Sequence, residues 1–569
     1  MSEKKSDQKS QNISKEKTGL QFERRDIIKG LTAVPAVLLY AWNYYKKKAL
    51  DKMRSGEIME ELSLRKKAPA VLKNKKPGDL IRLGVIGYGW RGAQDLKAAG
   101  FGNPEWAAKA KAASDKNKLD KRFETYLQQE DLNVSLTGVC DVFSTRRDQG
   151  VASSVSTVRP NGIQPQTEPA KAYLDYQDML ASDDIDAVII TTPDHWHAKM
   201  AIDAERAGKH VYVEKCMTRT MEEAQAMYDS FNGSKMKLQL GHHSRAAASH
   251  EKAKEIIDND ILGPVTLVEI TTNRNSPGGA WVYPIQWNSI EDYGQKYNSK
   301  DLFATPKSLD WDRWQGPAPN KVPFNLERYF RWRCWYDYGT GLSGDLFSHD
   351  FDAVNQIMDL GIPKTVSSSG GIYRYTKENF PELIKHERDV PDNFQTILEY
   401  PDKNLTVIYS ATLTNSNYRG KKFMGHDATM EVGSGLTVTP DPYSTRYKEK
   451  IADGIINTAL PMFAYSPGSK DVDGVTSATA KYFAQKGLVY TYKEGKRVDP
   501  THLHVADWLD CIRNGGEPRC NIEEGFEEAV ACHMATESYL QGRRVEWDPV
   551  KKRIVYIQHL KRGRLIWVI

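Results

Sequence analysis

The sequence has few cysteines and no long hydrophobic run. Six cysteines occur among 569 residues, and none forms a CxxC motif or a Cys/His ligand spacing. This scarcity argues against a structural zinc site and against a disulfide-stabilised scaffold. We expect buried free thiols, although Cys511 and Cys520 could pair if the chain is exported. The lack of repeated long apolar segments excludes a polytopic membrane protein.

An excess of charge of one sign is also missing. The net charge is only +5, although 27% of the residues are charged, and the first 80 residues supply the basic excess. We find no basic helix, zinc-finger spacing or RNA-binding aromatic motif, so nucleic acid is not an expected partner. With 40% hydrophobic residues, a chain of this length is typical of a globular protein with two or more domains.

The N-terminal region has the features of a targeting signal. Arg24 and Arg25 follow a polar, Lys-rich stretch and precede an apolar run from Gly30 to Trp42. This layout resembles a twin-arginine export signal, which predicts a protein in the periplasm or anchored in the membrane and facing the periplasm. We assign 1–50 to this signal or anchor.

Two features leave the fate of the signal open. No A-x-A cleavage site follows the apolar run, and three lysines stand at 46–48. Cleavage and membrane anchoring therefore both remain open, as does a buried N-terminal helix of a cytoplasmic protein. The charged stretch 51–79 is predicted to be a linker.

A glycine-rich turn follows the first predicted strand. In "LIRLGVIGYGWRGAQDLKAA" the turn contains five candidate cofactor contacts, namely Gly87, Gly89, Trp90, Arg91 and Gly92. Gly87 permits the tight turn, Gly89 lets the backbone approach a pyrophosphate, and Gly92 lets the helix pack on the strand. The pyrophosphate would lie at the helix N-terminus, where free N–H groups favour an anion.

An acidic residue ends the next apolar run. Asp141, in "SLTGVCDVFSTRRD", is placed to hydrogen-bond the adenosine ribose and to repel a 2′-phosphate, which favours NAD. Arg146 and Arg147 leave NADP as the less favoured cofactor. Asp141 lies much further from the glycines than the usual 20 or so residues. We therefore predict that 101–130 is an insertion that extends the first helix and its following loop.

A further strand, loop, helix and strand follow in "IDAVIITTPDHWHAKMAIDAERAGKHVYVEKC". The carboxyl ends of parallel strands open into the ligand crevice, so this loop and the last strand's end are expected near the cofactor. The candidate cofactor contacts are Thr192, Pro193, His195, His197 and Glu214. A merely structural role for the two histidines remains open, and a zinc site with Asp194 is not favoured.

Several motifs together resemble one enzyme family. "GYGWRG", "TTPDHWHA", "EKC" and "GLSGDLFSHDFDAVNQIM" at 341–358 make the chain, over about 80–540, similar to the Gfo/Idh/MocA oxidoreductases. The resemblance implies an α/β fold with an N-terminal Rossmann domain, a doubly wound parallel sheet, at 80–243. It also implies a C-terminal α/β substrate domain with an open, mostly antiparallel sheet at 244–500. The helices and tail at 501–569 are expected to pack back on the Rossmann domain.

The same resemblance implies the catalytic residues. The lysine of the family's Glu-Lys-Pro triplet corresponds to Lys215, and its D-x-x-x-H pair to Asp345 and His349. Cys216 replaces the usual proline, which puts the local backbone in doubt. His349 is the expected general base, Lys215 would bind the same oxygen or relay its proton, and Asp345 would orient the site. This mechanism needs no metal.

The implied reaction is hydride transfer between a hydroxyl carbon of a sugar, glycoside or cyclitol and NAD(P). Aromatic residues interleaved with polar ones between 278 and 341 suit sugar rings, although they also fit a Trp-rich core or an oligomer contact. We expect a homo-oligomer and, for an exported enzyme, a tightly bound cofactor. Two alternatives remain: a glycoside-cleaving enzyme that oxidises its substrate transiently, and a non-catalytic sugar-binding protein.

Overall fold

The computed structural model describes residues 78–275, 279–282, 285–286, 289–292, 295–296, 304–466, 491–493 and 496–556. These residues belong to one compact unit that spans Glu57–Ile569. The predicted export signal or anchor at 1–50 and nearly all of the predicted linker at 51–79 lie outside the described residues.

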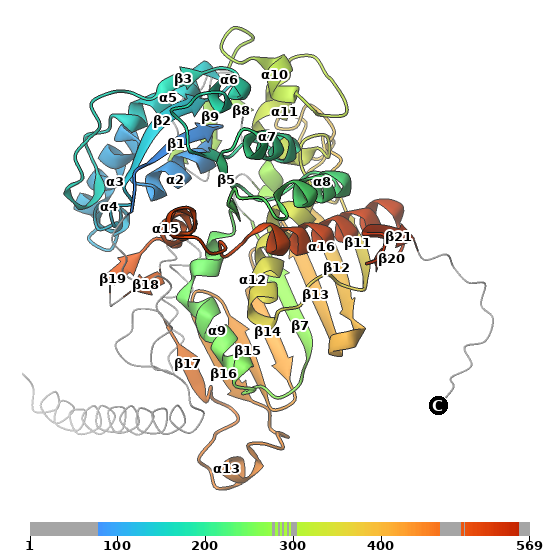
Figure 1. Cartoon of the computed structure of the whole chain (residues 1–569). Helices are drawn as coiled ribbons and strands as arrows, with labels where there is room; N and C mark the ends of the chain where they lie inside the picture. Colours follow the sequence, from blue (N-terminus) through green and yellow to red (C-terminus); the bar gives the residue numbers. More distant parts are fainter. Residues whose placement is uncertain are drawn as a thin grey trace, which may run out of the picture. The chain divides into compact units, whose positions relative to one another are not determined.

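The first domain is built on a parallel sheet of six strands in the order β3-β2-β1-β4-β5-β6 (Figure 1). The central strand β4 consists of buried Ala187, Val188, Ile189 and Ile190, as is typical of a parallel strand covered on both faces. This arrangement confirms the predicted doubly wound sheet. The strands are β1 (Ile81–Ile86), β2 (Val134–Cys140), β3 (Lys171–Tyr173), β4 (Ala187–Ile190), β5 (His210–Val213) and β6 (Leu238–Leu240).

Helices of the first domain connect these strands. They are α2 (Trp90–Ala98), α3 (Pro104–Lys116), α4 (Arg122–Leu127), α5 (Ser144–Ser154), α6 (Tyr176–Leu180), α7 (Asp194–Arg206) and α8 (Met221–Phe231). The predicted insertion does not extend the first helix. Gly100, at φ +95°, follows the end of α2, and Asn103 then caps the separate helix α3 by accepting from the Glu105 and Trp106 N–H groups.

The second domain contains a ten-stranded sheet in the order β17-β16-β15-β14-β7-β13-β12-β11-β20-β21. All neighbouring strands are antiparallel except β7 and β13, which confirms the predicted open and mostly antiparallel sheet. Burial alternates strictly along β13, so one face carries the core. The strands are β7 (Val265–Thr272), β11 (Thr365–Gly371), β12 (Asn393–Tyr400), β13 (Leu405–Thr412), β14 (Arg419–Gly425), β15 (Ala428–Val432), β16 (Leu436–Pro440), β17 (Phe463–Tyr465), β20 (Val545–Asp548) and β21 (Arg553–Tyr556).

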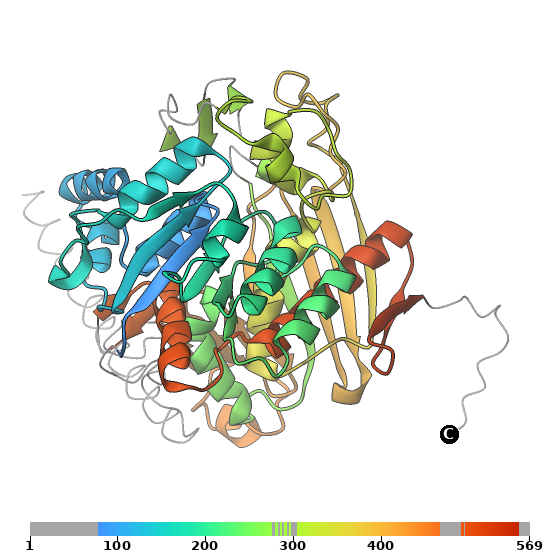
Figure 2. The ribbon, with the colours of Figure 1, turned by 45° about the horizontal axis from the view of Figure 1, so that its top comes forward.

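Three longer helices accompany this sheet: α9 (Ala248–Asp258), α12 (Ser348–Met358) and α16 (Ile522–Gln541). Helix α16 packs on β11 and also on α8 of the first domain, and the two helices lie side by side in Figure 2. It therefore joins the cores of the two domains. The shorter elements are α10 (Trp311–Gln315), α11 (Leu326–Phe330), α13 (Lys448–Ala452), β8 (Ile285–Gln286), β9 (Ser289–Asp292), β10 (Gln295–Lys296), β18 (Thr491–Lys493) and β19 (Lys496–Val498).

The C-terminal region contributes to both domains. Helix α15 (Pro500–Asn514) packs on the first domain, where His502 Nδ1 lies 2.8 Å from the Ala98 carbonyl oxygen and Trp508 packs edge-on against Tyr212. Strands β20 and β21, by contrast, extend the second sheet. The described part of this region, up to residue 556, therefore contributes to both domains.

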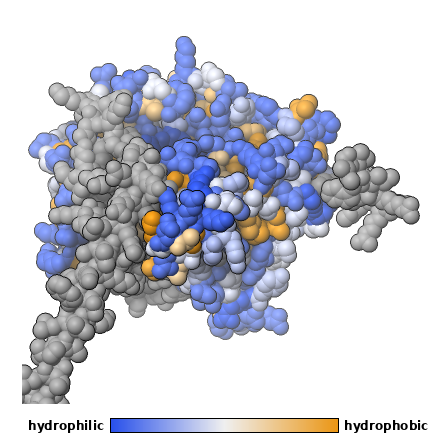
Figure 3. Space-filling view, turned by 90° about the horizontal axis from the view of Figure 1, so that it is seen from below, coloured by the Kyte–Doolittle hydropathy of each residue, from blue (hydrophilic) through white to orange (hydrophobic). Residues whose placement is uncertain are grey.

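The lower face of the described molecule is mainly hydrophilic, with hydrophobic residues in small separate groups (Figure 3). Of the helices that the structure describes, none combines the length and the hydropathy needed to cross a membrane.

Candidate functional site

The three glycines of the glycine-rich turn, Gly87, Gly89 and Gly92, have different structural roles. Gly87 adopts φ +89°, and a Cβ on Gly92 would lie 2.4 Å from the Gly87 carbonyl oxygen, so only glycine lets α2 start this close to β1. A Cβ on Gly89 would meet no atom within 4 Å. Gly89 is the N-cap of α2, which has neither a side-chain cap nor an acidic residue in its first turn. This helix start leaves space and N–H donors for an anion.

A cavity of about 1010 Å³ lies beside this turn and extends to the second domain. Half-exposed Trp90 stands at its first-domain end. Eleven of the predicted site residues line this cavity, namely Gly87, Gly89, Trp90, Arg91, Asp141, Thr192, Pro193, Glu214, Lys215, Asp345 and His349.

Asp141 directly follows β2, as predicted. Its Oδ2 accepts from the Tyr88 N–H at 2.7 Å and its Oδ1 from the Phe143 N–H at 2.8 Å. Burial raises the pKa of Asp141, and these two hydrogen bonds oppose the rise. The carboxylate is thus fixed at the cavity wall near Arg146, in a position suited to a ribose.

Arg91 and Glu214 pair with each other across the first domain. The Arg91 Nε lies 2.8 Å from Glu214 Oε1, and its Nη2 lies 2.8 Å from Oδ1 of buried Asp95. Both predicted cofactor contacts therefore also brace α2 against the end of β5. The charge that each presents to the cavity is partly neutralised by the other.

Lys215 crosses to the second domain. Its Nζ lies 2.7 Å from Asp345 Oδ1 and 2.6 Å from the Asp345 carbonyl oxygen. Arg333 Nε also donates to Asp345 Oδ1 at 2.8 Å, and Trp281 Nε1 donates to Oδ2 at 3.0 Å. Burial acts to raise the pKa of Asp345, but the charges of Arg333 and Lys215 outweigh it and hold the pKa below its ordinary value. Asp345 is therefore an ionised anchor for the Lys215 ammonium group.

His349 is the second residue of α12 and lies within a continuous helical segment. A π-helical turn, Ser343–Phe347, carries Asp345 and runs into α12, so both side chains reach the same cavity. Burial lowers the pKa of His349, and electrostatic interactions with Lys215, His242, His243 and Arg91 lower it further. A neutral imidazole on the cavity wall is a proton acceptor at neutral pH.

The two histidines of the TTPDHWHA motif lie in the first turn of α7 rather than in a loop, and neither lines the cavity. His195 Nε2 lies 3.1 Å from the Trp314 carbonyl oxygen. His197 lies between the Cys216 and Thr192 carbonyl oxygens, at 2.6 and 2.7 Å from its ring nitrogens. In this structure, both histidines connect segments around the cavity.

Cys216 is fully buried, and its peptide bond with Lys215 is cis. A Cβ on Gly344 would lie 2.8 Å from its Sγ, so the thiol packs directly against the turn that carries Asp345. All six cysteines are unpaired and buried, as predicted. Among the described residues, no group of three or more His, Cys, Asp and Glu side chains could hold a metal ion.

Sequence reasoning did not identify several residues of the site. Arg333 and Trp281 hold Asp345, and they come from the aromatic segments for which the sequence suggested sugar stacking, a Trp-rich core or an oligomer contact. His243 lines the cavity just after β6. Applying the strand-end rule to this next parallel strand would have found "GHHS". Trp106 and Lys109 of α3 also line the cavity, which an insertion in the sequence does not reveal.

Comparisons with known proteins agree with this architecture. Residues 81–242 match the description "Oxidoreductase family, NAD-binding Rossmann fold" of the Gfo/Idh/MocA family. Residues 247–367 and 308–547 match two descriptions of the family's C-terminal alpha/beta domain. Together these matches cover most of the chain.

Among curated proteins, the chain is 27% identical over 265 residues to a "Glycosyl hydrolase family 109 protein" of Shewanella putrefaciens, covering 47% of this chain and 48% of the relative. It is 24% identical over 325 residues to a protein of the same name from Shewanella baltica, covering 57% and 58%. The chain thus spans about half the length of the curated relatives that it matches.

Among solved structures, the apo form of levoglucosan dehydrogenase shares the fold with a TM-score of 0.52 at 16% identity, covering 82% of this chain and 99% of that one. An NAD binding oxidoreductase from Klebsiella pneumoniae gives a TM-score of 0.51 at 16% identity, covering 82% and 98%. With both domains matched and the cavity between the glycine-rich turn and Asp345, the chain belongs to the Gfo/Idh/MocA oxidoreductase family.

Proposed function

We propose that the protein is an NAD-dependent oxidoreductase that acts on a CH–OH carbon of a sugar, glycoside or cyclitol. The observation that carries the proposal is that Lys215, Asp345 and His349 line the same cavity as Gly89 and Asp141. A substrate in this cavity would therefore contact both the proton-transfer groups and a bound dinucleotide.

The cofactor half of the cavity fits NAD. When bound, NAD supplies the acceptor or donor of hydride. The open space at Gly89 and the uncapped start of α2 suit the pyrophosphate, and the fixed Asp141 carboxylate suits the ribose hydroxyls. A buried carboxylate at that position disfavours the 2′-phosphate of NADP.

The substrate half supports the proton transfer. Oxidation of a carbinol requires that its hydroxyl proton leave as hydride leaves the carbon. Neutral His349 accepts that proton, and the Lys215 ammonium group donates a hydrogen bond to the oxygen. Asp345 keeps Lys215 in place, because it accepts from Nζ while Arg333 and Trp281 fix the carboxylate.

The wall near Asp345 supports a carbohydrate substrate. Trp281, Phe330 and Trp332 line it together with Arg333, whose guanidinium lies 4.1 Å from the Trp332 ring centroid. Aromatic faces stack on the C–H face of a pyranose, and polar groups between them bind hydroxyls.

A panel of monosaccharides and glycosides mixed with the enzyme and NAD tests the activity. Stoichiometric NADH with an oxidised sugar supports the dehydrogenase. The name of the curated relatives favours a second candidate, a glycoside-cleaving enzyme, which would release the aglycone without net NADH. If neither NADH nor a released aglycone is detected, both proposals are contradicted and a sugar-binding protein is left.

The insertion supports a tightly bound cofactor. Asn103, Trp106 and Lys109 of this segment line the first-domain end of the cavity, and Lys97 lies 5.1 Å from the Trp106 ring centroid. We expect NAD(H) to copurify and to be released on denaturation, as measured by absorbance and mass spectrometry. Protein free of nucleotide after gentle purification would contradict this part of the proposal.

We also propose that the chain is exported by a twin-arginine route and forms a homo-oligomer. The Arg24-Arg25 pair before an apolar run supports export. Replacing both arginines by lysine should abolish export of a fused reporter, and a reporter that is still exported would contradict the route.

Light scattering of the purified protein tests the homo-oligomer. A monomeric mass would contradict it.

A further inference from the structure

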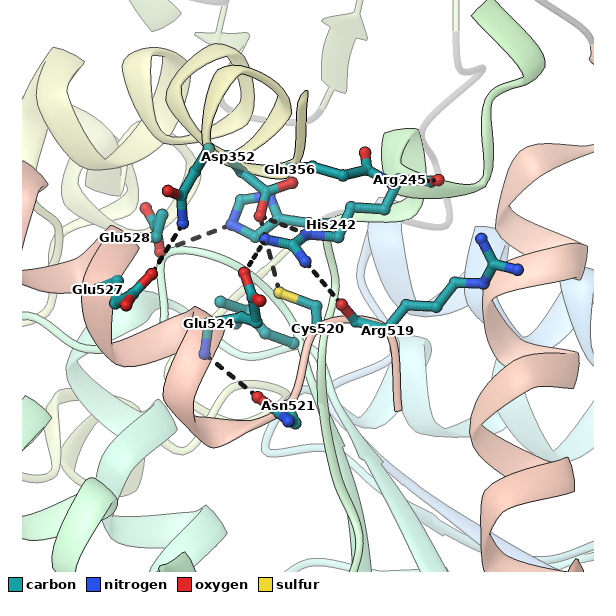
Figure 4. Close-up of polar contacts among 12 residues, drawn as sticks. His242, Arg245, Asp352, Gln356, Arg519, Cys520, Asn521, Glu524, Glu527 and Glu528 are labelled. Atoms are coloured by element: carbon teal, nitrogen blue, oxygen red, sulfur yellow. Dashed lines mark hydrogen bonds and ion pairs between the residues drawn. The ribbon is translucent and has the colours of Figure 1, made fainter. Parts of the chain in front are cut away.

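A buried cluster of charged residues lies next to His349 but outside the cavity lining. His242 follows β6, Arg245 belongs to the 3₁₀ turn His243–Ala246, Asp352 lies on α12 and Glu528 on α16 (Figure 4). The side chains of His242, Asp352 and Glu528 are fully buried. Three segments that are distant in the sequence therefore bring ionisable groups together at the seam between the two domains.

The distances within the cluster show which acidic residues pair with Arg245 and with His242. Arg245 Nε lies 2.7 Å from Asp352 Oδ1, and its Nη2 lies 2.7 Å from Glu524 Oε2. His242 Nε2 lies 3.5 Å from Glu528 Oε2. Among the described side chains, His242 is the only basic group within ion-pairing distance of Glu528. A buried carboxylate without a cation is strongly unfavourable, so this pairing favours a protonated His242.

His242 also contacts the catalytic candidate. Its ring centroid lies 5.5 Å from that of His349, with the rings at 84° to one another. His243 lies on another side of His349, at 6.0 Å between ring centroids. The cluster is thus in direct contact with the proposed base, although His242 itself is not on the cavity wall.

The two neighbouring histidines have opposite electrostatic surroundings. Burial lowers the pKa of His242, but Asp352 and Glu528 outweigh it and raise the pKa above its ordinary value. The pKa of His349 is lowered by burial and by the charges around it. Neighbouring titratable groups whose pKa values are driven apart are typical of acid and base assignments.

We propose that His242 and Glu528 form a charge-setting pair, in which Glu528 keeps a positive charge on His242 and that charge keeps His349 in its proton-accepting form. His242 is then a positioning residue that acts through His349. The inference rests on the proposed function only for the role of His349 as the base.

The other groups that face this pair are consistent with the proposal. The groups that lower the pKa of His349 come from the end of β5, from α2 and from the segment after β6, namely Lys215, Arg91, His242 and His243. Burial and the charge of Arg91 lower the pKa of His243 itself to about 4, so at neutral pH the positive charges among them are those of Lys215, Arg91 and His242. Around His242, Asp352 and Glu528 both raise the pKa of the imidazole, while Arg245 opposes them. Buried His504 of α15 also faces the cluster, and its pKa is lowered mainly by burial.

Titration of labelled histidines by NMR tests the pair directly. Replacing His242 alone (His242→Gln) is expected to raise the pKa of His349 by about two units, for a charge at this separation in a medium of effective dielectric constant about 20. The double change His242→Gln/Glu528→Gln leaves no unpaired buried carboxylate and should fold more readily. It should give a smaller rise of about one unit, because the negative charge is lost too. The acid limb of kcat/KM should move by the same amounts.

Glu527→Gln is the matched control. Glu527 is the neighbouring residue on α16, and its carboxylate accepts from Asn355 Nδ2 at 3.0 Å instead of facing His242. This variant should leave the titration of His349 unchanged. The signal of His349 is assigned by its loss in His349→Gln.

Three results would overturn the proposal: no shift of His349 in folded His242 variants, an equal shift in Glu527→Gln, or a neutral His242 at pH 7 in the wild-type protein. The wild-type measurement needs no variant at His242, because its signal can be assigned by elimination through substitution of the other histidines. The NMR titration does not depend on turnover. An expected shift in a protein without oxidoreductase activity would therefore contradict the proposed function and leave the pair intact.

Discussion

Glu214 and Lys215 are neighbours at the end of β5, but their side chains belong to different halves of the cavity. Glu214 turns back to Arg91 on α2, within the first domain. Lys215 reaches Asp345 in the second domain. The cofactor half is formed largely by backbone groups and by charges that already have partners, whereas the substrate half is formed by charged side chains from both domains.

This difference predicts how the two halves respond to substitution. Backbone donors at the start of α2 remain when a nearby side chain is changed, unless the new side chain blocks the approach. Side chains that transfer or hold a proton cannot be replaced by their neighbours. We therefore expect large catalytic losses in the substrate half and losses of binding or folding in the cofactor half.

The largest effect is expected for Lys215→Met. Loss of the ammonium group should lower kcat by about 10²- to 10⁴-fold, because the reacting oxygen loses its donor and Asp345 loses a cation. Binding of NADH, measured by fluorescence, should change little. Lys254→Met is the control, since Lys254 pairs with Asp359 away from the cavity. If Lys215→Met keeps more than a tenth of the wild-type kcat, the expected difference in catalytic loss between the substrate half and the cofactor half is contradicted.

A smaller catalytic loss is expected for His349→Gln, about 10²-fold in kcat. The pH profile of the wild-type enzyme sharpens this prediction. Because the pKa of His349 is lowered from 6.5, the base form persists below that pH, and kcat/KM should fall only at more acidic pH. This acid limb should vanish in the variant. A limb at pH 7 or above in the wild-type enzyme would mean that another group is the base.

In the cofactor half, two glycines should separate folding from binding. Gly92→Ala places a Cβ 2.4 Å from the Gly87 carbonyl oxygen, and should lower the free energy of unfolding by about 1–3 kcal/mol. Gly89→Ala has free space for the new methyl group and should fold normally, but it should bind NADH several-fold more weakly. Denaturant unfolding and cofactor titration measure the two effects. Equal stability of the two variants would contradict the close packing of α2 on β1.

The smallest effect is expected for His195→Phe. The structure gives His195 a hydrogen bond to the Trp314 carbonyl oxygen and no place on the cavity wall. The substitution should lower the free energy of unfolding by about 1 kcal/mol and leave the KM for NAD within about twofold. A tenfold rise in this KM at unchanged stability would instead support a direct contact with the cofactor.

Local patterns were sufficient for the parallel sheet of the first domain and for the cofactor half of the site, whereas the second domain and the catalytic residues came from the resemblance to the family. The glycine spacing after β1, the acidic residue after β2 and the apolar runs between them identify parallel strands whose ends meet at one edge. Asp345 and His349 were identified through the resemblance to the family, whose D-x-x-x-H pair they match, and a spacing of four residues brings two side chains to one side of a helical segment. The resemblance also supplied their roles, and the structure adds that Lys215 Nζ lies 2.7 Å from Asp345 Oδ1.

Other features depend on contacts between distant segments. The insertion was predicted to extend α2, but the chain ends that helix at Gly100 and starts α3, which lines the cavity. His195 and His197 could be either ligands or structural residues, because a histidine motif does not show which carbonyl oxygens will lie beside it. The structure places those oxygens on Trp314, Thr192 and Cys216.

By itself, the sequence determined the parallel strands of the first domain, which strand ends carry functional groups, and that Lys215 lies at one of them. Those properties follow from hydrophobic periodicity and local backbone preferences, which act over a few residues. Only the tertiary structure decided which charges are paired. The contact of Lys215 with Asp345, and the contact of His242 with Glu528, join residues that are far apart in the chain. Electrostatic interactions depend on separation and burial in space, so these pairs arise only when the two domains pack together.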